Sequence, residues 1–413
     1  MIPIIKNRQA IITGVGVVNA ISNNFNEFIS AMRKGKCGQT LITGLNIEGL
    51  RNLTACEAVN FDPAPVYKKR GRLHRKMNRS SELVMSAFDE ALTMSGLDPH
   101  SVDSEKGAVV FGSTLGGAIA GLHYYRGVLK NKCRPSILQD YSLHAPGYRI
   151  CIETEFLGPN LVFSSACTSS NQALATALDL IRFGKADVVI AGGYDTLSEV
   201  SCSGFSVMRN VSLDLCCPFD VNRQGLVLGE GCAVLIVEAS DFSAKRGATA
   251  LASIKGYGVT SDAFHMTAPD NTALGPAACM QQAISMGGRI SDVDFICTHG
   301  TGTVHNDKTE AKAIYKVFGD ERASQIPCTS IKSMLGHTLG AAGAMNAVAS
   351  IAGSQSGFIP PTIHFKEPDK QNPLSCSASA RNVVPRLALS NSLGFGGANC
   401  SVLLELNSSE NKK

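Results

Sequence analysis

The sequence has no tryptophan, no CxxC pair and no long apolar run, and these absences exclude several classes of protein. No stretch offers the roughly 18–20 uninterrupted apolar residues of a membrane span, because glycines break candidates such as 108–122. The N-terminus lacks the cleavage site of a secretory signal peptide. A net charge of +4 is too small to indicate nucleic-acid binding. We therefore expect a cytoplasmic protein without membrane insertion or a nucleic-acid partner.

Fourteen cysteines are scattered along the 413 residues, and in a reducing compartment most would be small buried apolar residues. Cys167 has a distinctive setting in residues 163–184, FSSACTSSNQALATALDLIRFG, where it stands between an apolar strand and a long helix. Free N–H groups and positive potential at a helix start lower the pKa of a cysteine. On this stretch alone, a nucleophile and an ordinary buried cysteine are equally good interpretations.

Strand-like and helix-like runs alternate along the chain, which indicates an α/β fold. The predicted strands are AIITGVGVV, GAVVFGS, LVFSSA, DVVIAGG, AVLIVE, SIKGYGV, DFICTHG and ALSNSLG. The predicted helices are SELVMSAFDEALTMSG, SSNQALATALDLIRFG, ALGPAACMQQAISMG, TEAKAIYKVFG and AAGAMNAVASIAGS. The order around Cys167, a serine-bearing strand and then a small-residue helix, recurs at 329–357. Both helices are apolar all round, so we expect two equivalent halves, each with a buried helix.

Residues 297–314, CTHGTGTVHNDKTEAKAI, form a second segment with chemistry-bearing residues. A strand runs into His299 and then into a loop of glycine and threonine. Such a loop suits a slender polar ligand, because the hydroxyls form hydrogen bonds and the glycines allow close approach. The simpler interpretation of His299 is a core histidine that closes a strand. His305 is expected on the surface.

A third segment, SIKSMLGHTLGAAGA at 330–344, places Lys332 and His337 on either side of a glycine turn before an apolar helix. A lysine there needs a partner, because burying an unpaired charge is costly. We expect Glu310 or Asp307 to provide it.

The fourth segment is NSLGFGGANC at 391–400, in which Phe395 is the one aromatic residue among glycines. Glycine runs usually mark tight turns, but here the ring is suited to a movable plug over a pocket. One cysteine and two histidines fit a thiolate that takes an acyl group beside neutral imidazoles that stabilise an oxyanion. Their spacing does not indicate a zinc site, and we expect no bound metal.

These four motifs, in this order, resemble those of the β-ketoacyl-[acyl carrier protein] synthases, the elongating type II ketosynthases of fatty-acid and polyketide pathways. Further matching segments are ITGVGVV, CPFDVNRQGLVLGEG, SDAFHMTAPD, FIPPTIHF and GFGGANCSVLLE. The resemblance covers almost the whole chain and implies the thiolase fold, with five α-β-α-β-α layers. Residues 1–245 would carry the nucleophile and residues 246–413 the catalytic histidines.

The resemblance implies roles for the residues already singled out. Cys167 would accept an acyl chain from the phosphopantetheine arm of a carrier protein. His299 and His337 would promote decarboxylation of a malonyl thioester, whose carbanion attacks the acyl-cysteine. Lys332 would support them, with Glu310 as its ion-pair partner.

The same resemblance assigns the substrate contacts. Thr301, Thr303 and Thr267 would bind the pantetheine arm. Phe395 would be the gate, and its backbone N–H would form the oxyanion hole with that of Cys167. No cofactor is expected, because the substrates arrive on the carrier protein's own phosphopantetheine.

The basic run KKRGRLHRKMNR at 68–79 has two interpretations. A solvated helix start is the simpler one, but the family docks acidic carrier proteins on a similar segment. Arg72, Arg75 and Lys76 match that segment best. The family is also dimeric, so we expect either a homodimer or a heterodimer with a chain-length-factor-like homologue.

Two positions depart from the family's pattern. Asn346 stands where many members carry a glutamate, and Ser170 makes the nucleophile motif ACTSS instead of ACTSG. These changes fit a ketosynthase of a polyketide or aryl-polyene pathway at least as well as a housekeeping fatty-acid enzyme. The alternative is a non-catalytic chain-length-factor-type subunit, a class that lacks the nucleophile kept here as Cys167.

Overall fold

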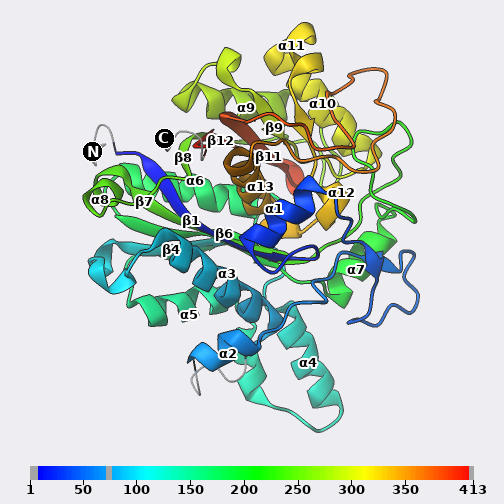
Figure 1. Cartoon of the computed structure of the whole chain (residues 1–413). Coiled ribbons are helices and arrows are strands. Elements are labelled where there is room, and N and C mark those ends of the chain that lie inside the picture. Colours follow the sequence, from blue (N-terminus) through cyan, green and yellow to red (C-terminus); the bar gives the residue numbers. More distant parts are fainter. Residues whose placement is uncertain (1–7, 71–76, 409–413) are drawn as a thin grey trace.

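The computed structural model describes residues 8–70 and 77–408, which fold around a ten-stranded mixed sheet (Figure 1). The strands of the sheet are β1 (Ala10–Asn19), β4 (Gly107–Gly112), β5 (Asn160–Phe163), β6 (Val188–Asp195), β7 (Gly231–Ala239), β8 (Ala252–Ser261), β9 (Phe295–Cys297), β10 (Cys328–Thr329), β11 (Leu387–Leu393) and β12 (Ala398–Leu406). A separate ladder pairs β2 (Thr40–Leu41) with β3 (Thr54–Ala55).

The strand order, β10-β9-β11-β12-β8-β1-β7-β6-β4-β5, contains the same topology twice. Counted from the centre, each set of five runs through its first, fifth, fourth, second and third strand. In each set the two inner pairings are antiparallel and the two outer pairings are parallel. The sets join where Ala10–Ile12 pair with Ala252–Ile254. Two equivalent halves are therefore confirmed in the topology, while the boundary between residues 245 and 246 stays a prediction.

Helices pack on the outer face of each strand set and also between the two sets. They are α1 (Phe25–Arg33), α2 (Ala64–Arg70), α3 (Arg79–Ser95), α4 (Ala118–Leu129), α5 (Ala145–Thr154), α6 (Ser169–Arg182), α7 (Glu199–Val207), α8 (Ser240–Lys245), α9 (Leu274–Gly287), α10 (Val304–Phe318), α11 (Asp320–Gln325), α12 (Lys332–Leu335) and α13 (Ala342–Ser356). α3 and α5 pack outside the first strand set, α9 and α10 outside the second, and α6 and α13 lie between the sets (Figure 1). These are the five predicted α-β-α-β-α layers.

The apolar runs of the sequence explain this layering. β4, β6 and β7 are buried along their whole length, as expected for strands covered on both faces. α13 is buried from Ala342 to Ser354, and α6 has no fully exposed residue, so the predicted burial of both helices is confirmed. At Gly16 a Cβ would lie 1.8 Å from Ala87 O, and only glycine lets α3 approach β1 so closely.

The two central helices also begin in the same way. Ala166 has φ +52° and Leu339 has φ +49°, and each stands three residues before the start of its helix, α6 or α13. Left-handed backbone is uncommon in residues with a side chain, and it reverses the chain sharply. The repeat therefore extends from strand order to backbone conformation.

Some elements differ from the sequence-based expectation. The predicted strand LVFSSA ends at Phe163, because its last residues form the turn that contains Ala166. β12 was missed, since its first residues belong to the glycine-rich motif, and β10 is only two residues long. Among residues 8–70 and 77–408, no helix is long and apolar enough to cross a membrane.

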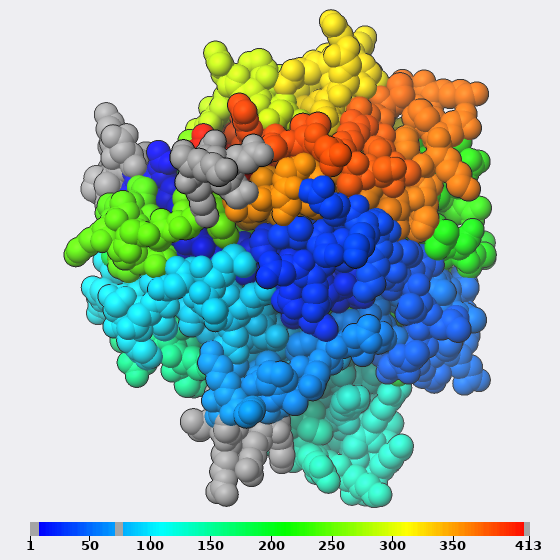
Figure 2. All heavy atoms as spheres, in the orientation of Figure 1, coloured from blue at the N-terminus to red at the C-terminus, as the bar shows by residue number. Residues whose placement is uncertain are grey.

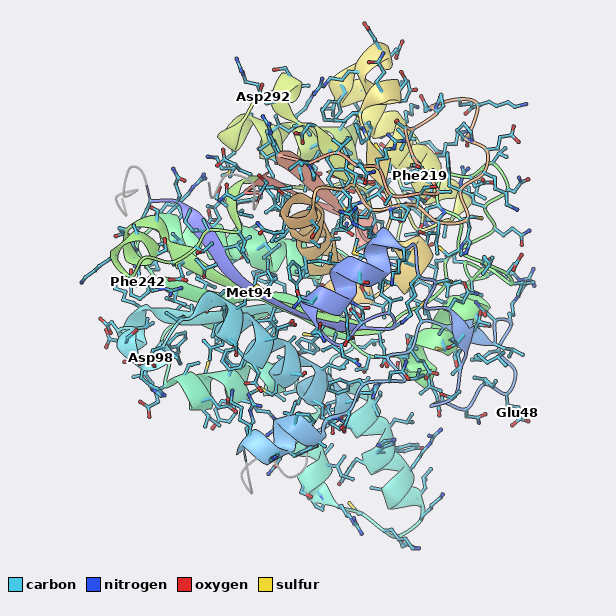
Figure 3. All side chains as sticks on the ribbon, viewed as in Figure 1. Glu48, Met94, Asp98, Phe219, Phe242 and Asp292 are labelled. Carbon is cyan, nitrogen blue, oxygen red and sulfur yellow. The ribbon has the colours of Figure 1, made fainter. Side chains whose placement is uncertain are left out.

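Segments that are far apart in the sequence lie side by side in the structure. α1 packs against α13, and the space-filling view shows the blue N-terminal region beside the orange C-terminal region (Figure 2). Charged side chains such as Glu48, Asp98 and Asp292 lie at the periphery (Figure 3).

Candidate active site

Cys167 lies in the tight turn between β5 and α6 and is 7% exposed. The turn is held by its own side chains: Ser169 Oγ donates to Ala166 O (2.6 Å) and accepts from Ser165 N (2.9 Å). A residue with positive φ at 166 is strained backbone of the kind found at functional sites. The local sequence therefore fixes the thiol at the start of a buried helix, as predicted.

His337 and His299 face this thiol from the second half of the chain. His337 Nε2 lies 3.0 Å from Cys167 Sγ, and the two imidazole rings meet edge to face with centroids 5.3 Å apart. His337 Nδ1 accepts the N–H of Leu339 (3.2 Å), so a neutral His337 carries its proton on Nε2, toward the sulfur. The sequence motifs thus meet: the ligand atoms of the three residues lie within 4.8 Å of one another.

Burial sets the charge state of this group. It lowers the pKa of His299 and of His337 well below 6.5, helped by the positive charge of Lys332, so both imidazoles are neutral near pH 7. Burial also raises the pKa of Cys167 to about 12, although Lys332 and the backbone N–H groups of Cys167 and Phe395 lower it in part. The expected lowering of the Cys167 pKa is wrong, because the loss of water outweighs the helix start.

Lys332 is buried at the first position of α12, but it does not form the expected ion pair with Glu310. The Glu310 carboxylate accepts the backbone N–H groups of His299 and Gly300 (both 2.8 Å) and Asn391 Nδ2 (3.3 Å). Lys332 Nζ has no hydrogen-bond partner among the residues that the structure describes. Burial lowers the pKa of Lys332, while Glu310 raises it through space. Lys332 thus acts on the site as an unpaired cation.

Asp307, the other expected partner of Lys332, organises the threonine loop instead. Its carboxylate accepts the N–H groups of Thr301 (2.9 Å) and Gly302 (3.1 and 3.2 Å). The hydroxyls of Thr301 and Thr303 lie 2.8 Å apart. The carboxylates at 307 and 310 therefore shape the backbone on either side of His299, and neither one neutralises Lys332 directly.

A cavity of about 260 Å³ joins these groups to the surface. Its walls include Thr301, Thr303 and Thr267, and also Phe395, so all the predicted pantetheine and gate residues line one space with the thiol. Phe395 begins a short turn with Gly396 and Gly397, both at positive φ, and its ring stacks on Phe205 with centroids 5.6 Å apart. The exposed His305 stands at this cavity, in agreement with its predicted surface position.

The turn that carries Phe395 packs directly against Cys167. A Cβ on Gly394 would lie 3.4 Å from Cys167 N, and the backbone N–H of Phe395 acts on Cys167 Sγ. The lining residues that sequence reasoning missed include Phe205 on α7 and Asn399 on β12. Nothing in the sequence around Phe205 distinguishes it from an ordinary apolar helix residue.

Asp195 at the end of β6 is another buried group that sequence reasoning missed. Its carboxylate accepts the N–H groups of Gly340 (2.6 Å), Thr114 (2.9 Å) and Leu115 (3.0 Å). Its negative charge raises the pKa of Cys167. Asp195 therefore connects the end of β6 and the loop after β4 to the turn before α13. Its carboxylate makes no hydrogen bond to the thiol.

The predicted carrier-docking residues Arg72, Arg75 and Lys76 lie outside the described residues. The arginines on either side have structural partners. Arg70 is almost fully buried and pairs with Asp89 (2.6 Å) and with Glu153, while Arg79 pairs with Glu230 (2.6 Å). The described ends of the basic run are thus anchored to the fold.

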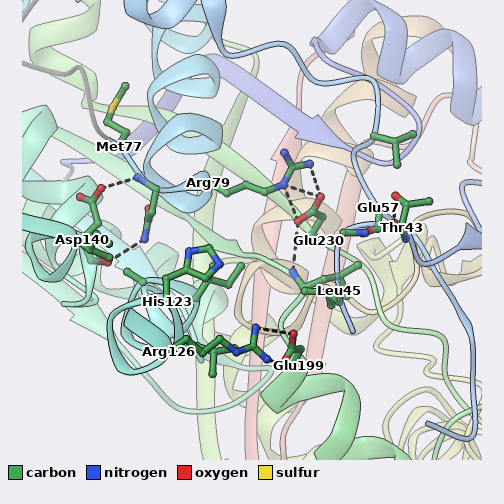
Figure 4. Close-up of a pocket in the computed structure, with 18 of the residues that line it drawn as sticks. Thr43, Leu45, Glu57, Met77, Arg79, His123, Arg126, Asp140, Glu199 and Glu230 are labelled. Atoms are coloured by element: carbon green, nitrogen blue, oxygen red, sulfur yellow. Dashed lines mark hydrogen bonds and ion pairs between the residues drawn. The ribbon is translucent and has the colours of Figure 1, made fainter. Parts of the chain in front are cut away.

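A larger cavity of about 740 Å³ lies between the start of α3, helix α4 and the loop at 43–45 (Figure 4). Its carboxylates are all engaged: Glu230 by Arg79, Glu199 by Arg126, Asp140 by the backbone N–H of Asn78, and Glu57 by Thr43. It shares no lining residue with the thiol cavity. Cys167, His299 and His337 all line the smaller cavity.

Comparison with known proteins agrees with this geometry. Residues 7–242 match the family described as "Beta-ketoacyl synthase, N-terminal domain", and residues 251–366 match "Beta-ketoacyl synthase, C-terminal domain". The chain belongs to the β-ketoacyl synthase family. This condensing acyltransferase is 34% identical over 411 residues to "3-oxoacyl-[acyl-carrier-protein] synthase 2" of Coxiella burnetii, with 97% of this chain and 99% of the relative covered.

The chain is also similar to a relative with a different name and to a solved ketosynthase structure. "Nodulation protein E" of Rhizobium sp. (strain N33) is 34% identical, with 95% of this chain and 98% of the relative covered. The solved structure of the ishigamide ketosynthase/chain length factor superposes with a TM-score of 0.90 at 30% identity, covering 97% of this chain and 99% of that one. The family, the fold and the ketosynthase class are thereby shown.

Proposed function

We propose that this ketosynthase catalyses the decarboxylative Claisen condensation of a malonyl-carrier protein with an acyl chain held on Cys167. The main support for this proposal is the 3.0 Å contact between His337 Nε2 and Cys167 Sγ, with the His299 ring packed edge to face against the His337 ring. A nucleophile, two neutral imidazoles and two backbone donors in one enclosed cavity suit acyl transfer through charged intermediates.

In the first half-reaction, Cys167 Sγ attacks the acyl thioester on the carrier's pantetheine. The S–C bond to the enzyme forms, the bond to the pantetheine sulfur breaks, and the proton of Cys167 leaves with the pantetheine thiol. The acyl oxygen carries the transient negative charge. The N–H groups of Cys167 and Phe395 are placed to stabilise it, and water exclusion strengthens both interactions.

In the second half-reaction, a malonyl thioester occupies the arm site formed by Thr301 and Thr303. Its carboxyl C–C bond breaks, CO₂ leaves, and the electron pair forms an enolate whose oxygen faces His299 and His337. The enolate carbon then attacks the acyl carbonyl, and the thiolate of Cys167 leaves. Neutral imidazoles suit this step, because they donate a hydrogen bond to the enolate without being consumed as acids.

The acyl chain is proposed to extend along an apolar cluster behind the thiol. Phe205 and Leu226 line the thiol cavity and pack in the same cluster as Leu197, Leu339 and Leu115. Leu197 also lines the larger cavity. The proposed acyl chain belongs to a type II polyketide, such as an aryl polyene, or to a fatty acid. Ser170 and Asn346 depart from the usual ketosynthase pattern, while the chain is 34% identical to a 3-oxoacyl-[acyl-carrier-protein] synthase 2.

The proposed partners are an acyl carrier protein and a second ketosynthase-like chain, identical or of the chain-length-factor kind. β5 ends the sheet, and its residues are half-buried or exposed. Leu157 and Leu161 add exposed apolar surface at this edge. An unpaired edge strand with apolar surroundings is a template for strand pairing with another chain.

The test is covalent loading by an acyl-carrier protein, followed by intact mass. The wild type should gain one acyl group, Cys167→Ala none, and the control Cys151→Ala, a half-buried cysteine of α5, one group like the wild type. An acylated Cys167→Ala variant would overturn the assignment.

The same acylation experiment also tests a second candidate function, that of a non-catalytic chain-length-factor-type subunit. A structure of a ketosynthase with its chain length factor from Xenorhabdus doucetiae superposes with a TM-score of 0.81 at 26% identity, covering 97% of this chain and 98% of that one, so the fold suits both roles. The kept cysteine, histidines and lysine favour catalysis. Absence of both acylation and CO₂ release by the folded wild type, alone and with its partner, would favour the second candidate.

A further inference from the structure

The two residues that depart from the ketosynthase pattern, Ser170 and Asn346, lie on the two central helices and are fully buried. Ser170 Oγ accepts the backbone N–H of Ala344 at 2.9 Å. That N–H belongs to the first turn of α13, where no residue of the same helix can accept it. The N-cap residue Ala341 offers no side-chain cap. Ser170 therefore caps α13 from the neighbouring helix α6.

Asn346 connects α13 to the strands that carry the other site residues. Its Nδ2 lies 3.2 Å from Thr298 O, 3.2 Å from Asn391 O and 3.5 Å from Cys297 O. All three groups are acceptors, so the amide nitrogen must be the atom that faces them. Thr298 immediately precedes His299, and Asn391 lies in β11, which runs to the Phe395 turn.

A continuous set of contacts thus spans the active site. It begins at the turn of Cys167, passes through Ser170 into α13, and divides at Asn346 between the strands that end at His299 and at Phe395. Every link is uncharged. This matters beside Lys332 and the two imidazoles, because a buried charge would change the pKa of each neighbour.

We propose that Ser170 and Asn346 are positioning residues that hold Cys167, His299 and Phe395 in their reacting arrangement, and that Asn346 does so without placing a negative charge beside His299. The inference rests on the proposed condensation. A carboxylate at 346 has no N–H to donate and would face three carbonyl oxygens. It would also favour the protonated form of His299, which the reaction does not use.

The first experiment compares Asn346→Asp, which keeps the shape but loses the donor, with Asn346→Ala. Decarboxylation of malonyl-carrier protein and acylation of Cys167 are measured separately across pH. Both variants should decarboxylate more slowly, by about tenfold or more. Acylation should fall less, because Asn346 reaches that step only through the Phe395 turn, which supplies one of the two donors to the acyl oxygen. In Asn346→Asp alone, the acidic limb of decarboxylation should move to higher pH, because the pKa of His299 rises.

A merely structural role predicts a different result. Both half-reactions would then fall together with thermal stability, and no limb would move. Equal loss in the two half-reactions, or decarboxylation by Asn346→Asp equal to the wild type, would overturn the proposal.

The second experiment tests whether the two residues act as one unit. Ser170→Ala leaves the N–H of Ala344 without its partner. Ser354→Ala is the matched control, because Ser354 is also buried on α13 and its Oγ has no hydrogen-bond partner among the described residues. Ser170→Ala should slow condensation, and Ser354→Ala should leave it unchanged. The double variant Ser170→Ala/Asn346→Ala should lose less than the product of the two single losses. Independent, multiplicative losses would show that no tether joins them.

These outcomes are distinguishable from failure of the proposed function. If the wild type neither acylates Cys167 nor releases CO₂, the condensation itself is wrong. If the wild type does both and the Ser170 and Asn346 variants match it, only the positioning role is wrong.

Discussion

Lys332 places an unpaired positive charge in an enclosed site that also holds Cys167 and two histidines. Its charge favours the thiolate and disfavours the imidazolium, so it lowers the pKa of all three groups. Burial acts on the thiol in the opposite direction and is the larger effect. The reactivity of Cys167 therefore depends on a cation that the fold leaves without a hydrogen-bond partner among the described residues.

We predict that Lys332→Met moves the pH profile of Cys167 alkylation by iodoacetamide to higher pH. Without the cation the thiolate is less stable, so the pKa of Cys167 rises, and at any pH below that pKa the thiolate fraction falls. A shift of about one pH unit corresponds to about tenfold slower alkylation. Lys308→Met, at an exposed position of α10, is the control and should leave the profile unchanged. A profile of Lys332→Met that overlays the wild type would contradict the argument.

The sequence predicted the members of the site but not their pairing. Cys167, His299, His337 and the threonine loop meet as their motifs indicated. The expected Lys332–Glu310 ion pair is absent, because the Glu310 carboxylate accepts the backbone N–H groups of His299 and Gly300 instead. Hydrogen bonds from the backbone cannot be read from a sequence motif. The roles of Ser170 and Asn346 were likewise hidden, since both depend on main-chain atoms distant in sequence.

At the scale of elements, α6 and α13 form the middle layer and touch through small residues. At Gly343 a Cβ would lie 2.5 Å from Asn171 Oδ1. The Asn171 side chain in turn donates to Ser390 O (3.2 Å) and Cys400 O (3.1 Å) on β11 and β12. A displacement at this crossing would therefore reach the strands behind it.

We predict that Gly343→Ala destabilises the protein by about 1–3 kcal/mol through overpacking of this crossing. Gly204→Ala, in α7, is the matched control, because a Cβ there meets nothing within 4 Å. It should be neutral or stabilise by up to about 1 kcal/mol, since alanine favours helix more than glycine. Urea unfolding of the two variants gives both values. Equal stabilities would mean that the central helices can separate at little cost.

Apolar patterning was sufficient to predict the two buried helices and most of the strands, while the five layers were implied by the resemblance to the ketosynthases. All-round apolar composition located α6 and α13, and buried runs located eight of the ten strands. The pattern did not predict β10, which has only two residues, or β12, which begins directly after the glycine-rich motif. Neither segment has a clear alternation of apolar and polar residues. It also could not show the left-handed turns at Ala166 and Leu339, which tertiary packing maintains.

At the scale of the whole molecule, the halves share one sheet and one central core. β1 and β8 join the strand sets, and one apolar cluster contains residues of β1, β7, α6, α13, β11 and β12. Because the two halves share this core, unfolding one half would expose apolar residues of the other half and destabilise it. Separate domains with separate cores would behave differently.

We predict one cooperative unfolding transition to which both halves contribute. Val237→Ala in β7 and Val402→Ala in β12 each remove two methyl groups from fully buried positions of that cluster. Each should lower the midpoint of the same transition, at a cost of about 1–3 kcal/mol. Circular dichroism and tyrosine fluorescence should report identical midpoints. Two separated transitions in either variant would show that the halves unfold independently.

The paired turns before α6 and α13 also determine how many substrates one chain can hold. Counted from Ala166 and Leu339, the position that matches Cys167 is Gly340, which has no side chain, and its N–H is already bonded to Asp195. The second copy of the turn therefore has neither a nucleophile nor a free donor for an acyl oxygen. On the proposed function we therefore expect a loading stoichiometry of one per chain, so that a pair of identical chains would hold two growing products and a pair with a cysteine-free homologue would hold one.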